Sequence, residues 1–316
     1  MAILTPEMVR EAAVRIRPLA RRTPVMTSRS LDAACGCNVF LKCENFQRGG
    51  SFKIRGASNL ILSIPEADLP RGVVAFSSGN HAQAVAIAAK HMGAPATIVM
   101  PLDAPKAKVE STRAQGAIIV TYDRFREDRE QVAAKILEEQ RATLVPPYDH
   151  PMIMAGQGTA ALELLEDVPD LDALVVCVGG GGLMAGSATI AHSVRPGIRL
   201  LGAEPELASD TAQSFAKGER VEIAPSETIA DGLRSPSPGK LTFPIVKQLA
   251  EDILLVSEDQ IREAMRFVMT RLKIVVEPSG AVSVAVALAG LLPRNIRRVG
   301  VLISGGNVDL DFLAKL

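Results

Sequence analysis

Short apolar runs alternate with amphipathic segments along the middle of the chain, and turn residues separate them. The runs predict strands at Val73–Phe76, Ala96–Met100, Ala117–Thr121 and Thr143–Pro146. The segments between them predict helices at His81–Met92, Lys106–Gln115 and Arg129–Glu139, two of which are followed directly by glycine. Short strands that alternate with helices are typical of a parallel α/β sheet.

A second alternation surrounds the first. It predicts strands at Asn38–Glu44, Leu174–Val178, Ile198–Ala203, Ile253–Val256 and Val299–Ile303. Helices are expected at Pro6–Leu19, Leu183–Val194, Glu258–Arg271 and Gly280–Leu291, and an irregular polar stretch at Glu204–Lys240. We therefore predict two open parallel-sheet α/β domains. Residues 1–69 and 148–316 form the large one, residues 70–147 form a small inserted one, and a ligand cleft lies between them.

Composition narrows the function classes. Hydrophobic residues make up 47% of the 316, and the formal net charge is zero, so no basic surface for nucleic acid is expected. No apolar run reaches membrane-spanning length, and the N-terminus has no signal-peptide pattern, so we expect a cytoplasmic protein that does not enter membranes. The four cysteines have no spacing of a common zinc site.

Lys53 stands out because it lies among apolar residues and glycines, between a predicted strand and a predicted helix. At a helix start the local dipole disfavours a positive charge, and burial disfavours it further. An amine in that position can be neutral and nucleophilic, which is what a Schiff-base lysine needs. The alternative is an ordinary solvated lysine.

Three polar turns come directly after apolar runs: Ser77–His81, Gly179–Gly182 and Ser304–Asn307. Ligands of open parallel sheets bind at the carboxyl edge, where such turns lie. The glycine turn leads into a helix and can cradle a phosphate with its backbone N–H groups. Gly180–Ala185 also satisfies G-x-G-x-x-A, with Glu204 ending the next strand, so a nicotinamide-dependent dehydrogenase stays an alternative.

With Lys53, these turns resemble the pyridoxal-phosphate enzymes of fold type II, in the group of threonine dehydratase, serine racemase and 3-hydroxyaspartate dehydratase. The resemblance covers nearly the whole chain and implies a tryptophan synthase β-like fold and a homodimer. It implies that Lys53 carries pyridoxal 5′-phosphate, that Asn80 bonds the 3′-oxygen and that Ser304 faces the pyridine nitrogen. The implied cofactor contacts are Phe52, Lys53, Asn80, Gly179, Gly180, Gly181, Gly182, Leu183 and Ser304.

The same resemblance implies an amino-acid substrate and β-elimination to a keto or imino acid and ammonia. Its implied contacts are Ser77, Ser78, Gly79, Asn80, His81, Arg129 and Ser235. Ser78 would lie on the ring face opposite Lys53 and could return a proton there, so serine- or aspartate-type racemisation is the alternative. Arg129 suits a second substrate carboxylate, which favours 3-hydroxyaspartate over serine or threonine. His81 is expected to be structural rather than a proton carrier.

Glu204, Ala208 and Asp210 match the positions at which racemase relatives bind a divalent ion. Two carboxylates and a backbone carbonyl suit Mg²⁺, Mn²⁺ or Ca²⁺. Without the resemblance, a solvated acidic loop would be the expected structure.

Overall fold

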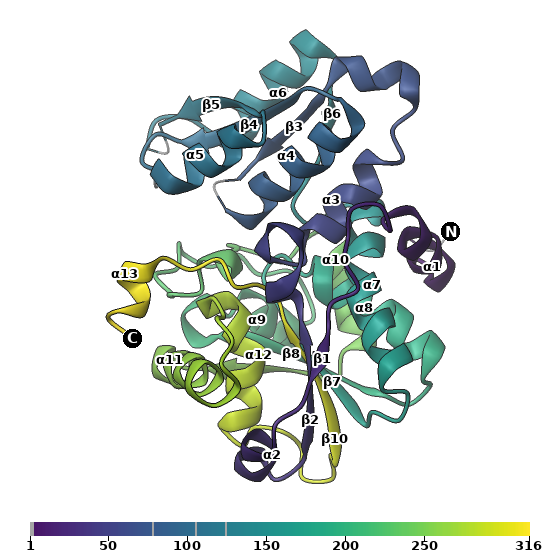
Figure 1. The fold of residues 1–316 in the computed structure, drawn as a ribbon, viewed down its shortest axis with the longest axis vertical. Coiled ribbons are helices and arrows are strands. Elements are labelled where there is room, and N and C mark those ends of the chain that lie inside the picture. The colour runs from purple at the N-terminus through teal and green to yellow at the C-terminus, as the bar shows by residue number, and fades with distance from the viewer. Residues whose placement is uncertain (1–2, 78, 105, 124) are drawn as a thin grey trace.

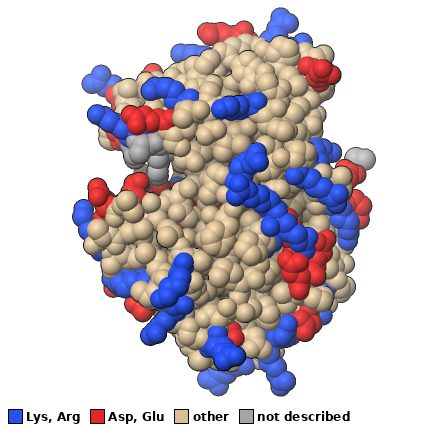
Figure 2. All heavy atoms as spheres, viewed as in Figure 1, with Lys and Arg blue, Asp and Glu red and all other residues tan. Residues whose placement is uncertain are grey.

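The computed structural model of the chain describes residues 3–77, 79–104, 106–123 and 125–316. Two sheets, each flanked by helices, lie one above the other (Figure 1). On the face drawn in Figure 2, Lys and Arg are interspersed with Asp and Glu rather than gathered by sign, in keeping with the formal net charge of zero. Among the described residues, none of the helices combines the length and hydrophobicity that crossing a bilayer requires.

The larger sheet has six strands in the order β1-β2-β10-β7-β8-β9. They are β1 Val25–Met26, β2 Asn38–Cys43, β10 Arg298–Ile303, β7 Ala173–Cys177, β8 Arg199–Pro205 and β9 Asp252–Val256. All neighbours are parallel except β1 and β2. Because β2 and β10 pair along their whole length, both ends of the chain build this sheet.

Helices cover both faces of the larger sheet, with α7 and α8 on one side and α11 and α12 on the other (Figure 1). The helices outside the smaller sheet are α1 Pro6–Arg15, α2 Arg29–Cys35, α3 Lys53–Ile61, α7 Pro151–Asp167, α8 Gly182–Val194, α9 Asp210–Lys217, α10 Thr242–Leu249, α11 Glu258–Phe267, α12 Pro278–Leu288 and α13 Leu310–Leu313. A sheet covered on both faces explains why β7 is buried at every position.

The smaller sheet is parallel throughout, in the order β5-β4-β3-β6. Its strands are β3 Val73–Phe76, β4 Ala96–Pro101, β5 Ile118–Tyr122 and β6 Thr143–Leu144, and its helices are α4 Asn80–Met92, α5 Lys106–Ala114 and α6 Arg129–Gln140. Helix α4 ends at Gly93, whose φ of 66° is the left-handed conformation that glycine adopts freely.

The predicted α/β class with two parallel-rich sheets is confirmed. Each strand among the described residues lies wholly inside or wholly outside the 70–147 segment, although the domain limits themselves stay a prediction. The prediction for Glu204–Lys240 is wrong in part, because α9 lies within it. This helix has only eight residues, and Glu204 accepts hydrogen bonds from its first-turn N–H groups, so tertiary contacts rather than local pattern stabilise it.

Candidate active site

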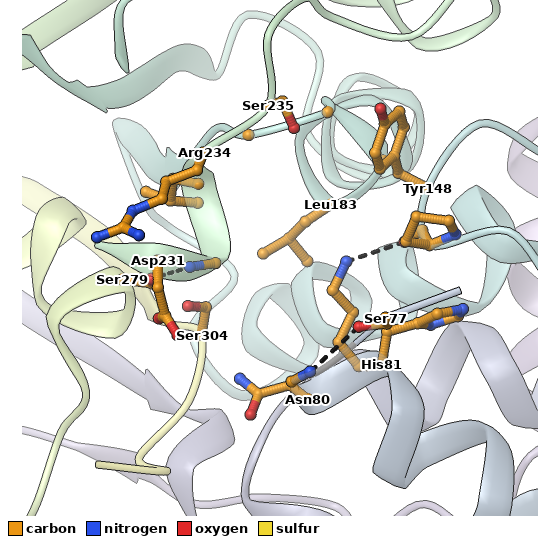
Figure 3. A pocket seen from close by; sticks show the side chains of 18 of the residues that line it. Ser77, Asn80, His81, Tyr148, Leu183, Asp231, Arg234, Ser235, Ser279 and Ser304 are labelled. Atoms are coloured by element: carbon orange, nitrogen blue, oxygen red, sulfur yellow. Dashed lines mark hydrogen bonds between the residues drawn. The ribbon is translucent and has the colours of Figure 1, made fainter. Parts of the chain in front are cut away.

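A cavity lies where the carboxyl ends of strands from both sheets meet. Its wall includes Lys53, the described residues of the Ser77–His81 turn, the Gly179–Gly182 turn and Ser304. The parallel pairing of β10 with β7 brings the last two turns to the same sheet edge. In Figure 3, Tyr148 and Ser235 lie toward one end of the cavity and Asn80 and Ser304 toward the other. The structure thus brings together the polar turns that the sequence predicted to meet.

Lys53 is the first residue of α3 and its side chain lines the cavity. Its Nζ donates to the carbonyl of Pro147 at 2.9 Å and lies 5.1 Å from the centre of the Phe52 ring. Burial lowers the pKa of Lys53 to about 8, although the charges of Cys177 and Glu277 act in the opposite direction. A substantial fraction of this amine is therefore neutral near physiological pH, as a nucleophile or a base requires.

The glycine turn connects β7 to α8 and leaves no room for side chains. A Cβ on Gly180 would lie 2.3 Å from the Tyr148 ring, and one on Gly182 would lie 2.4 Å from Oε1 of Gln157. Gly181 has a φ of 89° and caps α8. The first N–H groups of a helix have no partner within it, so this turn offers unobstructed donors to an anion. The residues present therefore fit the phosphate of the implied cofactor, with Leu183 beside them in the wall.

Asn80 begins α4 and is held in a network of polar side chains. Its Nδ2 donates to both oxygens of Glu277, at 2.8 and 3.1 Å, and its Oδ1 accepts from Asn307 at 2.9 Å. The N–H of Gly79 donates to Oγ of Ser77 at 3.2 Å. Ser78, predicted to face Lys53 across the ring, lies outside the described residues.

His81 lies behind this turn, where it is buried. Its Nε2 lies 2.8 Å from the carbonyl of Val145, which a neutral ring satisfies by donating. Burial and the nearby charge of Lys53 lower the pKa of His81 to about 3. Through this hydrogen bond the His81 ring connects α4 to the segment after β6.

Ser304 comes directly after β10 and is buried at the cavity wall. Its carbonyl accepts from the N–H of Phe52 at 3.0 Å, and Ser51 pairs with Gly305. These backbone contacts join the end of β10 to the start of α3. These contacts fix the position of Ser304 relative to Lys53, although the two residues lie 251 positions apart in the sequence.

Arg129 and Ser235 lie in the same cavity wall, on opposite sides of Tyr148 in the sequence. The guanidinium of Arg129, at the start of α6, lies 5.3 Å from the centre of the Phe76 ring. Burial raises the pKa of Tyr148, and the charge of Arg129 and a hydrogen bond with Ser235 oppose that rise. The three side chains therefore form one polar end of the cavity.

Glu204 and Asp210 form a second, separate group that does not line this cavity. Glu204 lies near the end of β8 and accepts from the N–H groups of Thr211 and Ala212, at 3.2 and 2.9 Å. Both oxygens of Asp210 are buried without a hydrogen-bond partner, and Ala208 is buried two residues before it. Burial raises the pKa of both carboxyl groups, that of Asp210 to about 7.

These features test both interpretations of the Glu204 region. Two buried carboxylates, one of them unpartnered, fit a divalent cation, which would supply the missing positive charge. Within the described part of the chain, no group of three or more His, Cys, Asp or Glu side chains is arranged to hold a metal ion, so the two carboxylates have no third ligand of these types. The carboxylate of Glu204 is occupied by α9 and is fully buried, so it cannot receive the ribose that a dinucleotide site requires.

Several residues of the cavity were missed in the sequence. Glu277 lies just before Pro278, in a turn after the apolar residues Ile274–Val276, and this turn has the same pattern as the three that were recognised. Tyr148 and Gln157 carry no local signal, because their roles come from packing on the glycine turn. Thr242 is not part of the cavity wall but supports it, because its hydroxyl donates to the carbonyl of Gly180 at 2.7 Å.

Comparison with known proteins agrees with this geometry. The family model described as "Pyridoxal-phosphate dependent enzyme" matches residues 16–305. The chain is 48% identical over 311 residues to serine racemase of Schizosaccharomyces pombe, which covers 98% of this chain and 96% of the relative. It is 51% identical over 307 residues to L-threo-3-hydroxyaspartate ammonia-lyase of a Pseudomonas species, covering 97% and 96%.

A solved structure of maize serine racemase superposes with a TM-score of 0.96 at 45% identity, covering 99% of this chain and 96% of that one. Because 99% of this chain is covered, the similarity extends over both sheets and over the segments that line the cavity. This chain belongs to the family of pyridoxal-phosphate dependent enzymes.

Proposed function

We propose that this protein eliminates the β-hydroxyl group of a hydroxy amino acid, with 3-hydroxyaspartate as the preferred substrate and serine or threonine as lesser ones. The products are a keto or imino acid and ammonia. The proposal is supported by one observation: Lys53, whose pKa is lowered, lines the same cavity as the glycine turn with its unobstructed N–H groups. The dehydrogenase alternative is wrong, because the family uses a different cofactor.

Each contact that the cofactor needs has a candidate residue in this cavity. The N–H groups of Gly179–Gly182 and Leu183 would hold the cofactor phosphate, and Asn80 would bond its 3′-oxygen. Ser304 would face the pyridine nitrogen, to which a hydroxyl cannot give a proton as a carboxylic acid would. When bound, pyridoxal phosphate attaches to the substrate amino group and withdraws electrons from its α-carbon.

Lys53 would then remove the α-proton, since its lowered pKa keeps the amine available as a base. The N–H groups of the Ser77–His81 turn would bind the substrate α-carboxylate. Arg129, with Ser235 beside Tyr148, would hold the distal carboxylate of 3-hydroxyaspartate by charge-assisted hydrogen bonds. The substrate is thus oriented at both ends while its α-proton faces Lys53.

Racemisation is the second candidate function, and the relatives favour it equally. Some are named serine racemase and others L-threo-3-hydroxyaspartate ammonia-lyase, at similar identity. Ser78 would be the second proton donor for racemisation. Both reactions begin when Lys53 removes the α-proton. Elimination then expels the β-hydroxyl group, whereas racemisation returns a proton to the opposite face of the α-carbon.

We further propose that Glu204, Asp210 and the carbonyl of Ala208 bind Mg²⁺, Mn²⁺ or Ca²⁺, on the support of the unpartnered Asp210 oxygens.

A homodimer is also part of the proposal. Its support is an exposed apolar pair, Phe46 and Val275, which are 41% and 47% exposed and adjacent through the Asn45–Val275 hydrogen bond. Sedimentation velocity would measure the oligomeric state, and a monomer at micromolar concentration would contradict it.

The experiment that tests the function combines trapping and a substrate panel. Borohydride should bleach the yellow protein and leave a pyridoxyl group on Lys53, detected by peptide mass spectrometry. In a panel of the 3-hydroxyaspartate isomers, serine and threonine, ammonia release should be fastest with one of the 3-hydroxyaspartate isomers. Chiral analysis of the same reactions measures any D-amino acid that forms. Lys53→Ala should lower turnover by at least about a thousandfold, whereas exposed Lys135→Ala should not change it. A trapped group on another lysine would contradict the proposal.

A further inference from the structure

Helix α3 joins the two halves of the molecule. Its apolar residues Ile54, Ala57, Leu60 and Ile61 belong to the hydrophobic cluster that also contains Val73, Ala75 and Ile98 of the smaller sheet. The glycine turn instead comes after β7, which lies in the separate cluster of the larger sheet. Lys53 and the phosphate cradle therefore rest on different hydrophobic cores, although both must contact one cofactor.

Arg55 is placed to connect them. Two residues after Lys53, it lies about 200° further round the helix, so it faces away from the cavity, and it is fully buried. Its Nε and Nη2 donate to the two oxygens of Glu44, at 2.7 and 2.8 Å. Its Nη1 and Nη2 donate to the two oxygens of Glu163, at 2.7 and 2.8 Å.

Both carboxylates lie on segments next to the larger sheet. Glu44 comes directly after β2 and Glu163 lies on α7. Lys42 of β2 completes the group, because its Nζ lies 2.7 Å from Oε2 of Glu163 and donates to the carbonyl of Thr23 at 2.7 Å. Two cations and two carboxylates leave this buried group, which we call the Arg55 network, without net charge.

The Arg55 network fixes the orientation of the groups that it joins and does not only add stability. Burial alone would raise the pKa of Glu163, but hydrogen bonds and charge from Arg55 and Lys42 hold it below its usual range. Buried ion pairs often add little stability compared with apolar residues of similar volume, whereas a bidentate guanidinium fixes orientation. The backbones of α3 and α7 also lie in close contact, since a Cβ on Gly156 of α7 would lie 2.4 Å from the carbonyl oxygen of Arg55.

We propose that Arg55 is a positioning residue that, through its paired bonds to Glu44 and Glu163, fixes the rotation and height of α3 against the larger sheet. Lys53 would thereby be held at the position from which its amine could reach a cofactor whose phosphate the glycine turn would hold. This inference rests on the proposed function, because it needs Lys53 to be the residue that carries the cofactor.

The test compares Arg55→Lys with the wild-type holoenzyme. The lysine keeps the charge but loses the forked geometry. The variant should retain pyridoxal phosphate through gel filtration, because the glycine turn is intact. The fraction of Lys53 that carries a pyridoxyl group after borohydride should fall at least about tenfold, since a misplacement of about 1 Å can cost on the order of a hundredfold in rate.

Arg22→Lys is the matched control, because Arg22 also pairs with carboxylates of α7, Glu166 and Asp167, but on the exposed surface. It should trap like the wild type. If circular dichroism shows that Arg55→Lys does not fold, Glu163→Gln replaces it in the test, because it removes the charge of one of the two carboxylates that Arg55 binds. The fraction of Lys53 trapped in Glu163→Gln should also fall.

Wild-type trapping in the folded Arg55 variant, or in Glu163→Gln where the former does not fold, would overturn the inference. A folded variant that loses the cofactor altogether would overturn it too, because Arg55 would then support the cradle rather than the amine. A wild-type protein that traps nothing on Lys53 would contradict the proposed function instead.

Discussion

At the scale of single residues, the surroundings separate side chains of the same type. Lys42 is buried and pairs with Glu163, whereas the amine of Lys53 donates to a carbonyl and burial lowers its pKa to about 8. The arginines differ in the same way. Arg55 is locked between two carboxylates, whereas Arg129 lies in the cavity wall against an aromatic ring.

Arg129 leads to a prediction about substrate choice. Arg129→Ala should lower kcat/KM for 3-hydroxyaspartate at least about tenfold, because a hydrogen bond to a charged group contributes about 1.5–3 kcal/mol. Serine, which has no second carboxylate, should be affected little. Steady-state assays of both substrates measure the ratio, and Arg126→Ala, with a side chain 86% exposed, is the control. Equal losses on the two substrates would mean that Arg129 is not a substrate contact.

At the scale of elements, turns at the carboxyl ends of parallel strands build the cavity. β10 and β7 pair in parallel, with Val299 opposite Ala173 and Val301 opposite Val175, so the Ser304 and glycine turns emerge side by side. The side chains of Tyr148, Gln157 and Thr242 pack against the glycine turn. Its shape depends on these packed neighbours as well as on its own residues.

Gly180→Ala tests that packing. The added methyl group would overlap the Tyr148 ring, and overpacking of this kind costs about 1–3 kcal/mol. We expect the Kd for pyridoxal phosphate to rise roughly 5- to 150-fold, measured by titrating the apoprotein. Gly36→Ala is the control for backbone strain without overlap: its φ of 70° disfavours alanine, but its added Cβ has no atom within 4 Å, so it should lower stability and leave the Kd unchanged. Unchanged affinity in Gly180→Ala would show that the turn tolerates a side chain.

At the scale of the whole molecule, buried charge makes stability depend on pH. Burial raises the pKa of Asp210 to about 7 from a usual value of 3.8. Between these values the unfolded chain has lost this proton while the folded chain retains it. The folded state binds more protons in that window, so its stability falls as pH rises from about 4 to about 7.

Thermal unfolding in EDTA should therefore show a lower Tm at pH 8 than at pH 5, apart from changes common to a control variant. Mg²⁺ or Mn²⁺ at a hundredfold excess over Kd should restore about 2–3 kcal/mol. Asp210→Asn should abolish both the pH effect and the response to the cation. Exposed Asp170→Asn is the control. A Tm that responds neither to pH in this range nor to the cation would mean that Glu204 and Asp210 do not form a cation site.

The sequence by itself determined the alternation of strands and helices, the parallel class and three of the turns in the cavity wall. These features arise from local periodicity and from turns, since every parallel strand delivers its following turn to the same edge. Val73–Phe76 was predicted with the bounds that the structure shows, and Lys53 was placed at the start of a helix. Each turn could therefore be predicted from residues that are near one another in the sequence, whereas the roles of its residues followed from the family resemblance and stay predictions.

Only the tertiary structure decided which distant residues complete that site. Glu277 accepts a hydrogen bond from Asn80, and the carbonyl of Pro147 accepts one from Lys53. Arg55 forms ion pairs with both Glu44 and Glu163. Helix α9 forms where the local pattern predicted irregular chain, because Glu204 caps it from the end of β8. The physical reason is that burial and pairing depend on strand order, which places β2 beside β10 and is not encoded in the period of either segment.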